Sequence, residues 1–391
     1  MDGEQSRRIP LQDNGLGQGL ILVAAALMCL GVVMSFSTAG ARRSPSAWYY
    51  RLDIRQAAFA AVGLLLLCAL WRRDYRWLVR RWCPERRILG WVLSPSGLLF
   101  LLAVGLAAGV LVLGRTVKGS ARWLRYGPIG FQPSELLKFA LLIYLAAFLT
   151  WVRDRAGSFW RAFVPAGALT AVACGLIVTQ DFGTAAIVGV GALAVMLMAG
   201  MRWWHFLVVP PAVAVGFYAF VYRVPYRWDR IAALTQPFSS TAPAAYQPRQ
   251  SVIAIGSGID PAGIGGGAAK YGYLPEAQPD FIFSVICQEL GLLGASLVIA
   301  LLLGWLLLAW RVAVRAPDRF GALLAGGLGA LVGLQAILHI AVTVWWMPPT
   351  GVSLCFVSAG GSGLLTLAAA TALIVSVSAR RGAGPEPERL D

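Results

Sequence analysis

Apolar runs of about 20 residues recur along the whole chain, and short polar connectors separate them. A helix of that length crosses the hydrocarbon core of a membrane, because each residue adds about 1.5 Å. The runs predict about ten spans, at residues 17–38, 54–71, 91–113, 133–151, 162–179, 182–200, 203–222, 281–310, 320–346 and 349–378. We therefore predict an all-α, polytopic membrane protein in which residues 1–391 form a single domain.

The composition of the chain excludes a soluble protein. Of its 391 residues, 58% are hydrophobic and 13% are charged, and the mean hydropathy is +0.69. A soluble domain of this composition would expose large contiguous apolar patches. The net charge of +15 would suit nucleic acid binding, but the arginines gather in short connectors such as residues 71–87. That pattern is typical of cytoplasmic loops beside anionic lipids, so we expect a membrane and no nucleic acid as partner.

The basic residues also predict the orientation in the membrane. With the N-terminus inside, alternation of the spans makes four basic segments cytoplasmic, namely 72–87, 152–161, 311–319 and the tail 379–391. Residues 39–53 carry arginines and would face outward, against this rule. Two other outward loops stand out: the basic loop 114–132, and the loop 223–280 between the seventh and eighth spans, which is the longest connector. Loops as long as the second are usually functional or disordered.

Few residues suggest a cofactor. The six cysteines are scattered, mostly inside apolar runs, and their spacing is typical of small buried side chains rather than disulfides or metal ligands. Neither His205 nor His339 has a metal-ligating neighbour at useful spacing. The stretch GSGIDPAGIGGG (256–267) lies in an outward loop without a strand–turn–helix unit, so it predicts tight turns rather than a nucleotide site.

The stretch YLPEAQPDFIF (273–283) places two carboxylates, Glu276 and Asp280, at the mouth of the eighth span. Asp280 follows a proline and precedes FIFS, so one interpretation is a helix N-cap. The other is a general base at the apolar boundary, where partial desolvation makes a carboxylate a stronger proton acceptor. The two interpretations are compatible and both stay open here. Glu276 is expected to shape the loop.

A further carboxylate, Glu289, falls inside the same predicted span. In a continuous helix it would lie about 13 Å beyond Asp280, near the middle of the membrane, where a carboxylate needs a polar partner. The last span carries VSAGGSG at a similar depth, with hydroxyls and small residues that allow close helix contact. We predict a structural polar lock, in preference to direct catalysis, between Glu289 and the motif residues Ser358, Gly360, Gly361 and Ser362.

The stretch FQPSELLK (131–138) opens the fourth span and carries Glu135 and Lys138 at i, i+3 spacing. One interpretation is a local ion pair on the first helical turn. The other is an anion site for a phosphate or pyrophosphate, because the loop before this helix N-terminus supplies Lys118, Arg122 and Arg125. Asp181, in TQDFGTA, also faces outward in the predicted topology. Together these residues suit chemistry on a lipid-linked pyrophosphate.

These segments resemble the SEDS family, the RodA, FtsW and SpoVE proteins of bacterial cell-wall synthesis. The block "KGAxRWI…QPSELxK" of that family is similar to VKGSARWLRYGPIGFQPSELLKFALLIYLA. Three further blocks of the family are similar, in the same order, to YQPRQSVIAIGSG, YLPEAQPDFIFSVICQELGLLG and PPTGVSLCFVSAGGSGLL. Its first-span motif resembles GVVMSFSTA. The similarity covers nearly the whole chain.

The resemblance implies a ten-helix glycosyltransferase of the bacterial cytoplasmic (inner) membrane, with both termini in the cytoplasm. It would polymerise lipid II into peptidoglycan strands at the outer face, for cell division or cell shape. The growing glycan would remain linked to undecaprenyl pyrophosphate. The implied partner is a class B penicillin-binding protein, which crosslinks the strands.

Asp280 matches the acid of the family's "LPExxTDFIF" motif and would deprotonate the sugar 4-hydroxyl of the acceptor lipid II. No general acid is evident, so Lys118 and Arg122 would steady the leaving pyrophosphate. A divalent cation, Mg²⁺ or Mn²⁺, is an open expectation for the same task. The other substrate-binding candidates are Glu135, Lys138, Asp181 and Gln247.

The chain departs from the family's pattern at six positions, which are Gln180, Pro279, His339, Cys355, Ala359 and Gly363. These departures leave the choice between division and elongation open, although PPTG before the last span favours the FtsW and SpoVE branch. Two other functions also stay open. One is a lipid II flippase, which intramembrane polar residues such as Glu289 would suit. The other is a non-catalytic scaffold that recruits the penicillin-binding protein.

Overall fold

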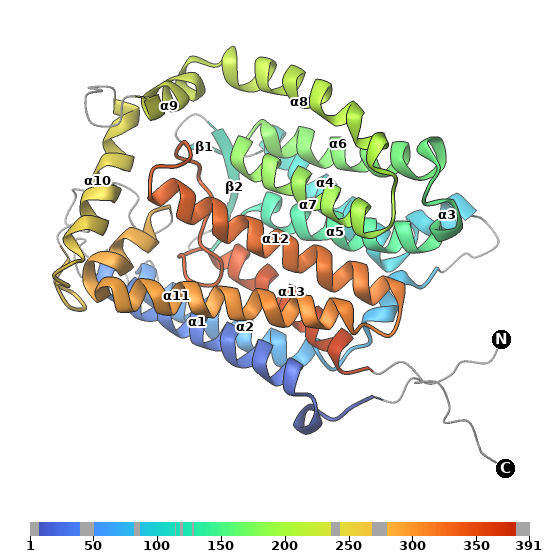
Figure 1. Ribbon diagram of the computed structural model, residues 1–391, viewed down its shortest axis with the longest axis horizontal. Coiled ribbons are helices and arrows are strands. Elements are labelled where there is room, and N and C mark those ends of the chain that lie inside the picture. The colour runs from blue at the N-terminus through green and yellow to red at the C-terminus, as the bar shows by residue number, and fades with distance from the viewer. Residues whose placement is uncertain are drawn as a thin grey trace.

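The fold is a bundle of helices that lie roughly side by side (Figure 1). The computed structural model describes residues 8–39, 51–81, 87–113, 115–117, 120–126, 129–235, 243–267 and 280–380. The helices of the bundle are α1 (Gly15–Ala39), α2 (Leu52–Leu70), α4 (Pro95–Leu113), α5 (Pro133–Trp151), α6 (Val164–Val178), α7 (Phe182–Met198), α8 (Val209–Phe217), α11 (Ile282–Val314), α12 (Arg319–Thr343) and α13 (Gly361–Ser378). The shorter helices are α3 (Arg87–Val92), α9 (Pro225–Thr235) and α10 (Pro243–Ser257).

Most helices of the bundle are long enough to cross a membrane. The described part of the chain contains nine candidate spans, and α7 is a shorter apolar helix beside them. Two of the nine combine α6 and α8 with the adjoining turns Phe159–Phe163, Trp203–Val208 and Tyr218–Tyr222. The predicted all-α polytopic fold with about ten spans is therefore confirmed.

The basic loop before α5 forms a small antiparallel sheet. Its strands are β1 (Arg115–Val117), β2 (Ser120–Tyr126) and β3 (Ile129–Phe131), in the order β1-β2-β3. Leu124 pairs with Phe131, and Arg125 pairs with Gly130. Strand β2 contacts α4 and α5, and β3 contacts α13. The sheet thus covers the ends of the central helices.

Helix α5 is the centre of the bundle. Every side chain from Leu137 to Leu149 is buried, and α4, α6, α7, α12 and α13 pack around it. Lipid supplies no hydrophobic force between helices, so close packing and polar contacts must hold such a helix in place. The polar residues at the start of α5 therefore lie in a protein interior rather than in lipid.

Glycines let α12 lie close to two of its neighbours, α7 and α11. A Cβ atom at Gly327 would stand 2.5 Å from Val195 Cγ2 of α7, and one at Gly333 would stand 3.1 Å from Leu306 Cδ1 of α11. These distances are shorter than almost all real Cβ contacts, so a larger residue would force the Val195 or Leu306 side chain to shift. Small residues at helix contacts are the usual device for packing in membranes.

The two ends of the described chain meet at one end of the bundle (Figure 1). Ile9 N donates to Ala379 O at 2.8 Å, and the Arg380 guanidinium lies 2.7 Å from Asp74 Oδ2. Helices α1 and α2 both pack against α13. The first and last helices are therefore neighbours, which agrees with the single domain that stays a prediction. We call this end of the molecule, which also carries the arginine-rich connectors, the basic end.

The predicted span 349–378 was wrong at its start. Helix α12 ends at Thr343 and α13 begins at Gly361, so residues 344–360 form an irregular segment between them. Trp345 and Phe356 have positive φ angles of 62° and 64°, and Pro348 and Pro349 cannot donate backbone hydrogen bonds. We call residues 344–360 the buried connector, because its middle is enclosed by protein.

Three other predicted segments differ from the structure. The span 281–310 is α11, and it is broken at Gly291, where φ is 63° and ψ is −158°, a conformation that only glycine adopts readily. The span 91–113 is two helices, because Pro95 starts α4 and the Ser94 hydroxyl accepts a capping bond from Gly97 N at 3.1 Å. The loop 223–280 contains α9 and α10.

Asp318 joins the start of α12 to the turn Tyr75–Val79 at the basic end. Its Oδ1 accepts a capping bond from Gly321 N at 2.8 Å at the start of α12, and its Oδ2 accepts a bond from Arg76 Nε at 2.9 Å. The Tyr75 hydroxyl also donates to this carboxylate. Burial, with the Asp318 contact in addition, raises the pKa of Tyr75 well above its ordinary value, so Tyr75 stays neutral.

We expect Asp318→Ala to destabilise the protein more than Asp318→Asn. Asparagine keeps an oxygen for the helix cap, whose loss costs about 1 kcal/mol, and both variants lose a partly exposed ion pair worth less than about 1 kcal/mol. The free energy of unfolding, measured by denaturant titration in detergent, checks this order. Equal losses in the two variants would contradict the capping role.

Candidate active site

Asp280 stands directly before α11. The start of α11 lies at the end of the bundle opposite the basic end (Figure 1). The Asp280 side chain is partly buried. The residue that caps the helix is Phe281, whose carbonyl accepts a bond from Ser284 N at 3.0 Å. The N-cap interpretation of Asp280 was therefore wrong by one residue, and its role as a base stays a prediction. Glu276 and Pro279 lie outside the described residues.

The first part of α11, residues 282–290, is a short rigid element that we call the strut. The side chains from Ile282 to Glu289 are buried, whereas Leu292 and Leu293 beyond the break are 82% and 84% exposed. Ser284 Oγ lies 2.5 Å from Ser251 Oγ of α10, and the Ser251 hydroxyl also bonds the Thr343 carbonyl at 2.6 Å. The strut is thus enclosed by protein, and only the rest of α11 is exposed at the bundle surface.

Glu289 lies at the far end of the strut and is 1% exposed. The Ser37 hydroxyl of α1 lies 2.8 and 2.6 Å from its two carboxylate oxygens, and Gly265 N donates to Oε2 at 3.2 Å. This geometry differs from the predicted lock with the segment 358–362. The prediction assumed a continuous α11 and a helix at 349–360, and neither is present.

The buried connector is held by side chains of the surrounding helices. His339 Nδ1 of α12 bonds the Val352 carbonyl at 2.8 Å, and Gln335 Nε2 donates to the Ser353 carbonyl at 2.8 Å. Gln56 Nε2 of α2 donates to the Ser358 carbonyl at 3.3 Å. Non-helical backbone is tolerated at membrane depth only where protein satisfies it in this way.

The residues of the VSAGGSG motif serve the turn into α13. Ser358 Oγ accepts a bond from Leu354 N at 2.8 Å, within the buried connector, and Ser362 Oγ accepts one from Gln132 N at 3.2 Å, before α5. Gly360 is the N-cap of α13, and a Cβ at Gly361 would stand 2.4 Å from Phe59 of α2. Packing against Phe59 therefore requires a small residue at Gly361, whereas a Cβ at Gly360 would meet no neighbour within 4 Å.

Three of the departures from the family pattern lie at or in the buried connector, namely His339, Cys355 and Ala359, and the first two are buried. His339 is 1% exposed and bonds the connector directly, as described above. Cys355 is fully buried, and its thiol lies 3.6 Å from the Val332 carbonyl of α12. The side chains of His339 and Cys355 are thus enclosed by protein, and each contacts a backbone carbonyl.

Glu135 and Lys138 form a buried ion pair on the first turns of α5. Lys138 Nζ donates to Glu135 Oε1 at 2.9 Å and lies 2.8 Å from Oε2. It also donates to Gln335 Oε1 of α12 at 2.7 Å, and it is 2% exposed. A Cβ at Gly363 would stand 3.0 Å from Glu135 Oε2, so this glycine leaves room for the carboxylate. The local ion pair is present, and substrate binding by these residues stays a prediction.

The pair also connects α5 to the buried connector. Gln335 receives the Lys138 bond through its oxygen and donates through its nitrogen to the Ser353 carbonyl. One amide thus links the charged pair to the backbone of the connector. In a low-dielectric interior such a network is strong only when each member is paired.

The other predicted substrate-binding residues do not form one group in the described part of the chain. Asp181 caps α7, accepting bonds from Gly183 N at 2.9 Å and from the Thr184 hydroxyl at 3.1 Å. Gln180 beside it is 2% exposed. Gln247 lies on α10 and is partly buried. Arg122 is on β2 with its side chain not described, and Lys118 lies outside the described residues, so the predicted anion site stays a prediction.

The described residues offer no group of three or more histidine, cysteine or acidic side chains that could hold a metal ion. The open expectation of Mg²⁺ or Mn²⁺ therefore gains no support from them. A cation bridged mainly by the phosphates of a substrate would need fewer protein ligands.

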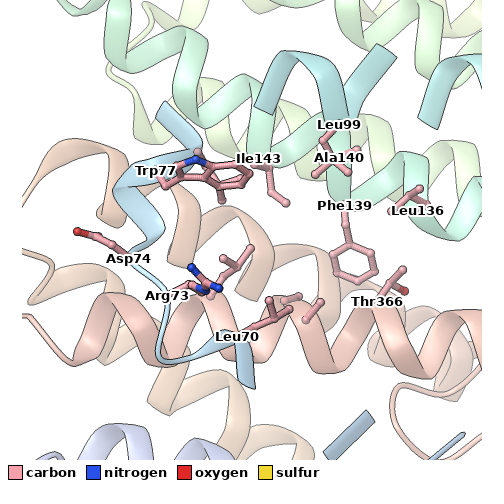
Figure 2. A pocket seen from close by; sticks show the side chains of 14 residues that line it. Leu70, Arg73, Asp74, Trp77, Leu99, Leu136, Phe139, Ala140, Ile143 and Thr366 are labelled. Carbon is pink, nitrogen blue, oxygen red and sulfur yellow. The ribbon is translucent and has the colours of Figure 1, made fainter. Parts of the chain in front are cut away.

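A cavity of about 620 Å³ lies between α2, α4, α5 and α13 (Figure 2). Arg73, Asp74 and Trp77, from the connector after α2, lie on one side of it (Figure 2). Its other walls are mostly apolar, with residues such as Leu99, Phe139 and Leu373. The cavity is therefore suited to a hydrocarbon chain rather than to a polar molecule.

Comparison with known proteins gives one family for nearly the whole chain. Residues 18–382 match the model of the FtsW, RodA and SpoVE family, which is described as a cell cycle protein family. The chain belongs to the FtsW/RodA/SpoVE family.

Relatives of this FtsW/RodA/SpoVE protein match over nearly their full length. A probable peptidoglycan glycosyltransferase FtsW of Geobacter sulfurreducens is 34% identical, over 94% of this chain and 96% of the relative. The stage V sporulation protein E of Bacillus subtilis is 31% identical, over 92% of this chain and 96% of that protein.

Solved structures of the family have the same fold. A chain from a peptidoglycan synthase complex, studied for its coordination of polymerization and crosslinking, superposes with a TM-score of 0.74 at 27% identity, covering 92% of this chain and 97% of that one. The rod shape determining protein RodA of Thermus thermophilus superposes with a TM-score of 0.61 at 25% identity, covering 92% of this chain and 95% of that one.

Three residues of this family member emerge only from the structure, namely Ser37, Ser251 and Gln335. They bind Glu289, Ser284 and Lys138 respectively. The sequence indicated only that such polar partners must exist, because buried charges in a membrane need them. It did not distinguish these side chains from the many other hydroxyls and amides of the spans.

We expect Lys138→Met to destabilise the protein by about 3 to 5 kcal/mol, because it leaves Glu135 buried without its partner. The double variant Glu135→Gln with Lys138→Met should recover much of the loss, since no charge is then buried. Unfolding titrations of the single and double variants form a double-mutant cycle. Additive losses in that cycle would contradict the pairing.

Proposed function

We propose that this protein is a peptidoglycan glycosyltransferase that polymerises lipid II at the outer face of the bacterial cytoplasmic membrane. The full-length similarity to relatives described as peptidoglycan glycosyltransferases carries this proposal. The position of Asp280 supports it, because a partly buried carboxylate at the outer end of a membrane bundle can reach a lipid-anchored sugar. The basic end would then face the cytoplasm, in accord with the positive-inside rule.

Asp280 acts in this proposal as the general base. Its carboxylate takes the proton of the 4-hydroxyl on the acceptor lipid II, and that oxygen forms a bond to the anomeric carbon of the donor glycan. The bond from this carbon to the pyrophosphate oxygen breaks, and undecaprenyl pyrophosphate leaves with inversion at the carbon. A pyrophosphate is already a good leaving group, so one carboxylate suffices, unlike the paired acids of glycosidases.

Cationic groups stabilise the leaving pyrophosphate in this proposal. Arg122 lies on β2 of the small sheet, next to the start of α5, and Lys118 precedes that strand in the chain. Positive charge aimed at a developing anion lowers the barrier of such transfers. The residues Glu135, Lys138, Asp181 and Gln247 would keep the walls of the site in shape, in addition to any contact with substrate.

The cavity of Figure 2 provides a place for part of the polyprenyl chain of a substrate. Its walls are mostly apolar, and it lies between four helices and the connector that follows α2. Each buried methylene contributes about 0.8 kcal/mol. A chain held there would position the pyrophosphate end of the same molecule from a distance.

A class B penicillin-binding protein would be the partner that crosslinks the product. The structural neighbour from a peptidoglycan synthase complex supports this part of the proposal. A flippase is the second candidate function, and the broken helix α11 with its buried Glu289 is the observation that favours it.

We expect Asp280→Asn to abolish polymerisation while the protein stays folded. Asparagine has nearly the shape of aspartate but cannot accept the proton. The measurement is glycan chain length on a gel, from purified protein with its partner and lipid II. Full polymerisation by the variant would overturn the assignment of the base. A flippase would instead move labelled lipid II across liposomes without forming polymer.

We expect Ala369→Trp, which fills the cavity, to raise KM for lipid II about tenfold. Excluding roughly two methylenes costs about 1.6 kcal/mol of binding. The matched control is Ala61→Trp on the exposed surface of α2, which should leave KM unchanged. Equal KM values in both variants and the parent would exclude a lipid chain from the cavity.

A further inference from the structure

The position of Asp280 depends on how the strut is held. Asp280 stands just before the strut, and the strut is separated from the rest of α11 by the break at Gly291. The membrane-length part of α11 therefore does not fix the direction of the strut. The contacts at the two ends of the strut must do so.

The start of the strut is fixed to α10 and α12. Ser284 Oγ contacts Ser251 Oγ at 2.5 Å, and the Ser251 hydroxyl bonds the Thr343 carbonyl at the end of α12. These contacts leave the other end of the strut to be fixed separately, because a rod held at one point can still turn about it.

The far end of the strut is fixed around Glu289. Its backbone carbonyl accepts a bond from Gly263 N at 3.0 Å, and the carbonyl of Gln288 accepts one from Ala262 N at 3.1 Å. Its carboxylate accepts the bond from Gly265 N and contacts the Ser37 hydroxyl of α1. A single side chain therefore joins the strut, the glycine-rich stretch that follows α10, and the first helix.

Glycines let the stretch 256–267 press against the strut. A Cβ at Gly258 would stand 2.0 Å from the Cys287 carbonyl oxygen, and one at Gly267 would stand 2.9 Å from Glu289 Cγ. This stretch and the strut are the two described flanks of the chain around Asp280. The carboxylate of Glu289 thus holds both flanks at once.

We propose that Glu289, with Ser37, is a positioning residue that sets the placement of Asp280 through the strut. This inference rests on the proposed function. A buried carboxylate is costly in a membrane protein, and the same space could be filled by an apolar residue if packing alone were required. An apolar side chain could not accept hydrogen bonds, whereas the carboxylate accepts them from two different elements at once. At 1.5 Å per residue, the strut transmits a shift at Glu289 over roughly 13 Å to Asp280.

The test compares Glu289→Gln and Ser37→Ala with the parent in lipid nanodiscs that contain lipid II. Both should lower kcat about 10- to 100-fold, the range expected when a catalytic group is misplaced by about 1 Å. KM should stay unchanged, because neither variant alters the substrate site. The thermal midpoint should fall modestly because a buried polar group loses a partner, so kcat is measured well below the midpoint of each variant. Ser37→Thr, which keeps the hydroxyl, should restore kcat.

Ser296→Ala is the matched control on α11 beyond the break. The Ser296 hydroxyl bonds the Leu293 carbonyl of its own helix at 3.0 Å, so its loss should change neither kcat nor KM. Hydrogen exchange of residues 256–267 gives an independent readout and should be faster in Glu289→Gln and Ser37→Ala. If Glu289→Gln fails to fold, Ser37→Ala, which changes a different helix, decides the question.

Unchanged kcat in both variants would overturn the inference, and so would a loss of kcat that only follows a loss of thermal stability. A different variant, Asp280→Asn, tests the proposed function. Asp280→Asn that still forms polymer overturns the base assignment whatever Glu289 does. Inactive Asp280→Asn together with fully active Glu289→Gln and Ser37→Ala leaves the base in place and removes only the positioning role.

Discussion

Every polar group buried in this bundle needs a protein partner, because a membrane interior supplies no water to bond it. The backbone of the buried connector meets this requirement through side chains of the surrounding helices. Its carbonyls take hydrogen bonds from Gln335, His339 and Gln56, which come from two different helices. Gln335 in turn is the partner of Lys138. The charged pair of α5 and the irregular backbone are therefore parts of one network, and each explains why the other is tolerated.

The same requirement explains why several polar candidates of the site have partners within the protein. Lys138 and Asp181 have their bonding capacity directed at other parts of the protein. Asp280 stands outside the helix cap, at the boundary of the bundle. Catalysis by Asp280 stays a proposal, and the structure adds that this residue precedes the cap of α11 instead of forming it.

The long spans were predictable because their apolar length is a strong physical signal. The prediction at 133–151 coincides with α5, and that at 203–222 coincides with the span Trp203–Tyr222. The start of the last span was not predictable, since LCFVSAGG is as apolar inside a buried connector as it is inside a helix. The break at Gly291 was missed because one glycine in an apolar run does not reveal its φ angle. The partner of Glu289 was missed because Ser37 is far away in the sequence and only the fold brings them together.

The pairing of the first and last helices also has a consequence for biosynthesis. Helices α1 and α2 enter the membrane early in translation, but both pack against α13, which is made last. Their polar faces, including Gln56 and Ser37, must wait for partners encoded more than half a chain later. Assembly of this bundle is therefore a late event that follows insertion of the complete chain. A nascent chain released early would expose these groups to lipid, a state that membrane quality control can recognise.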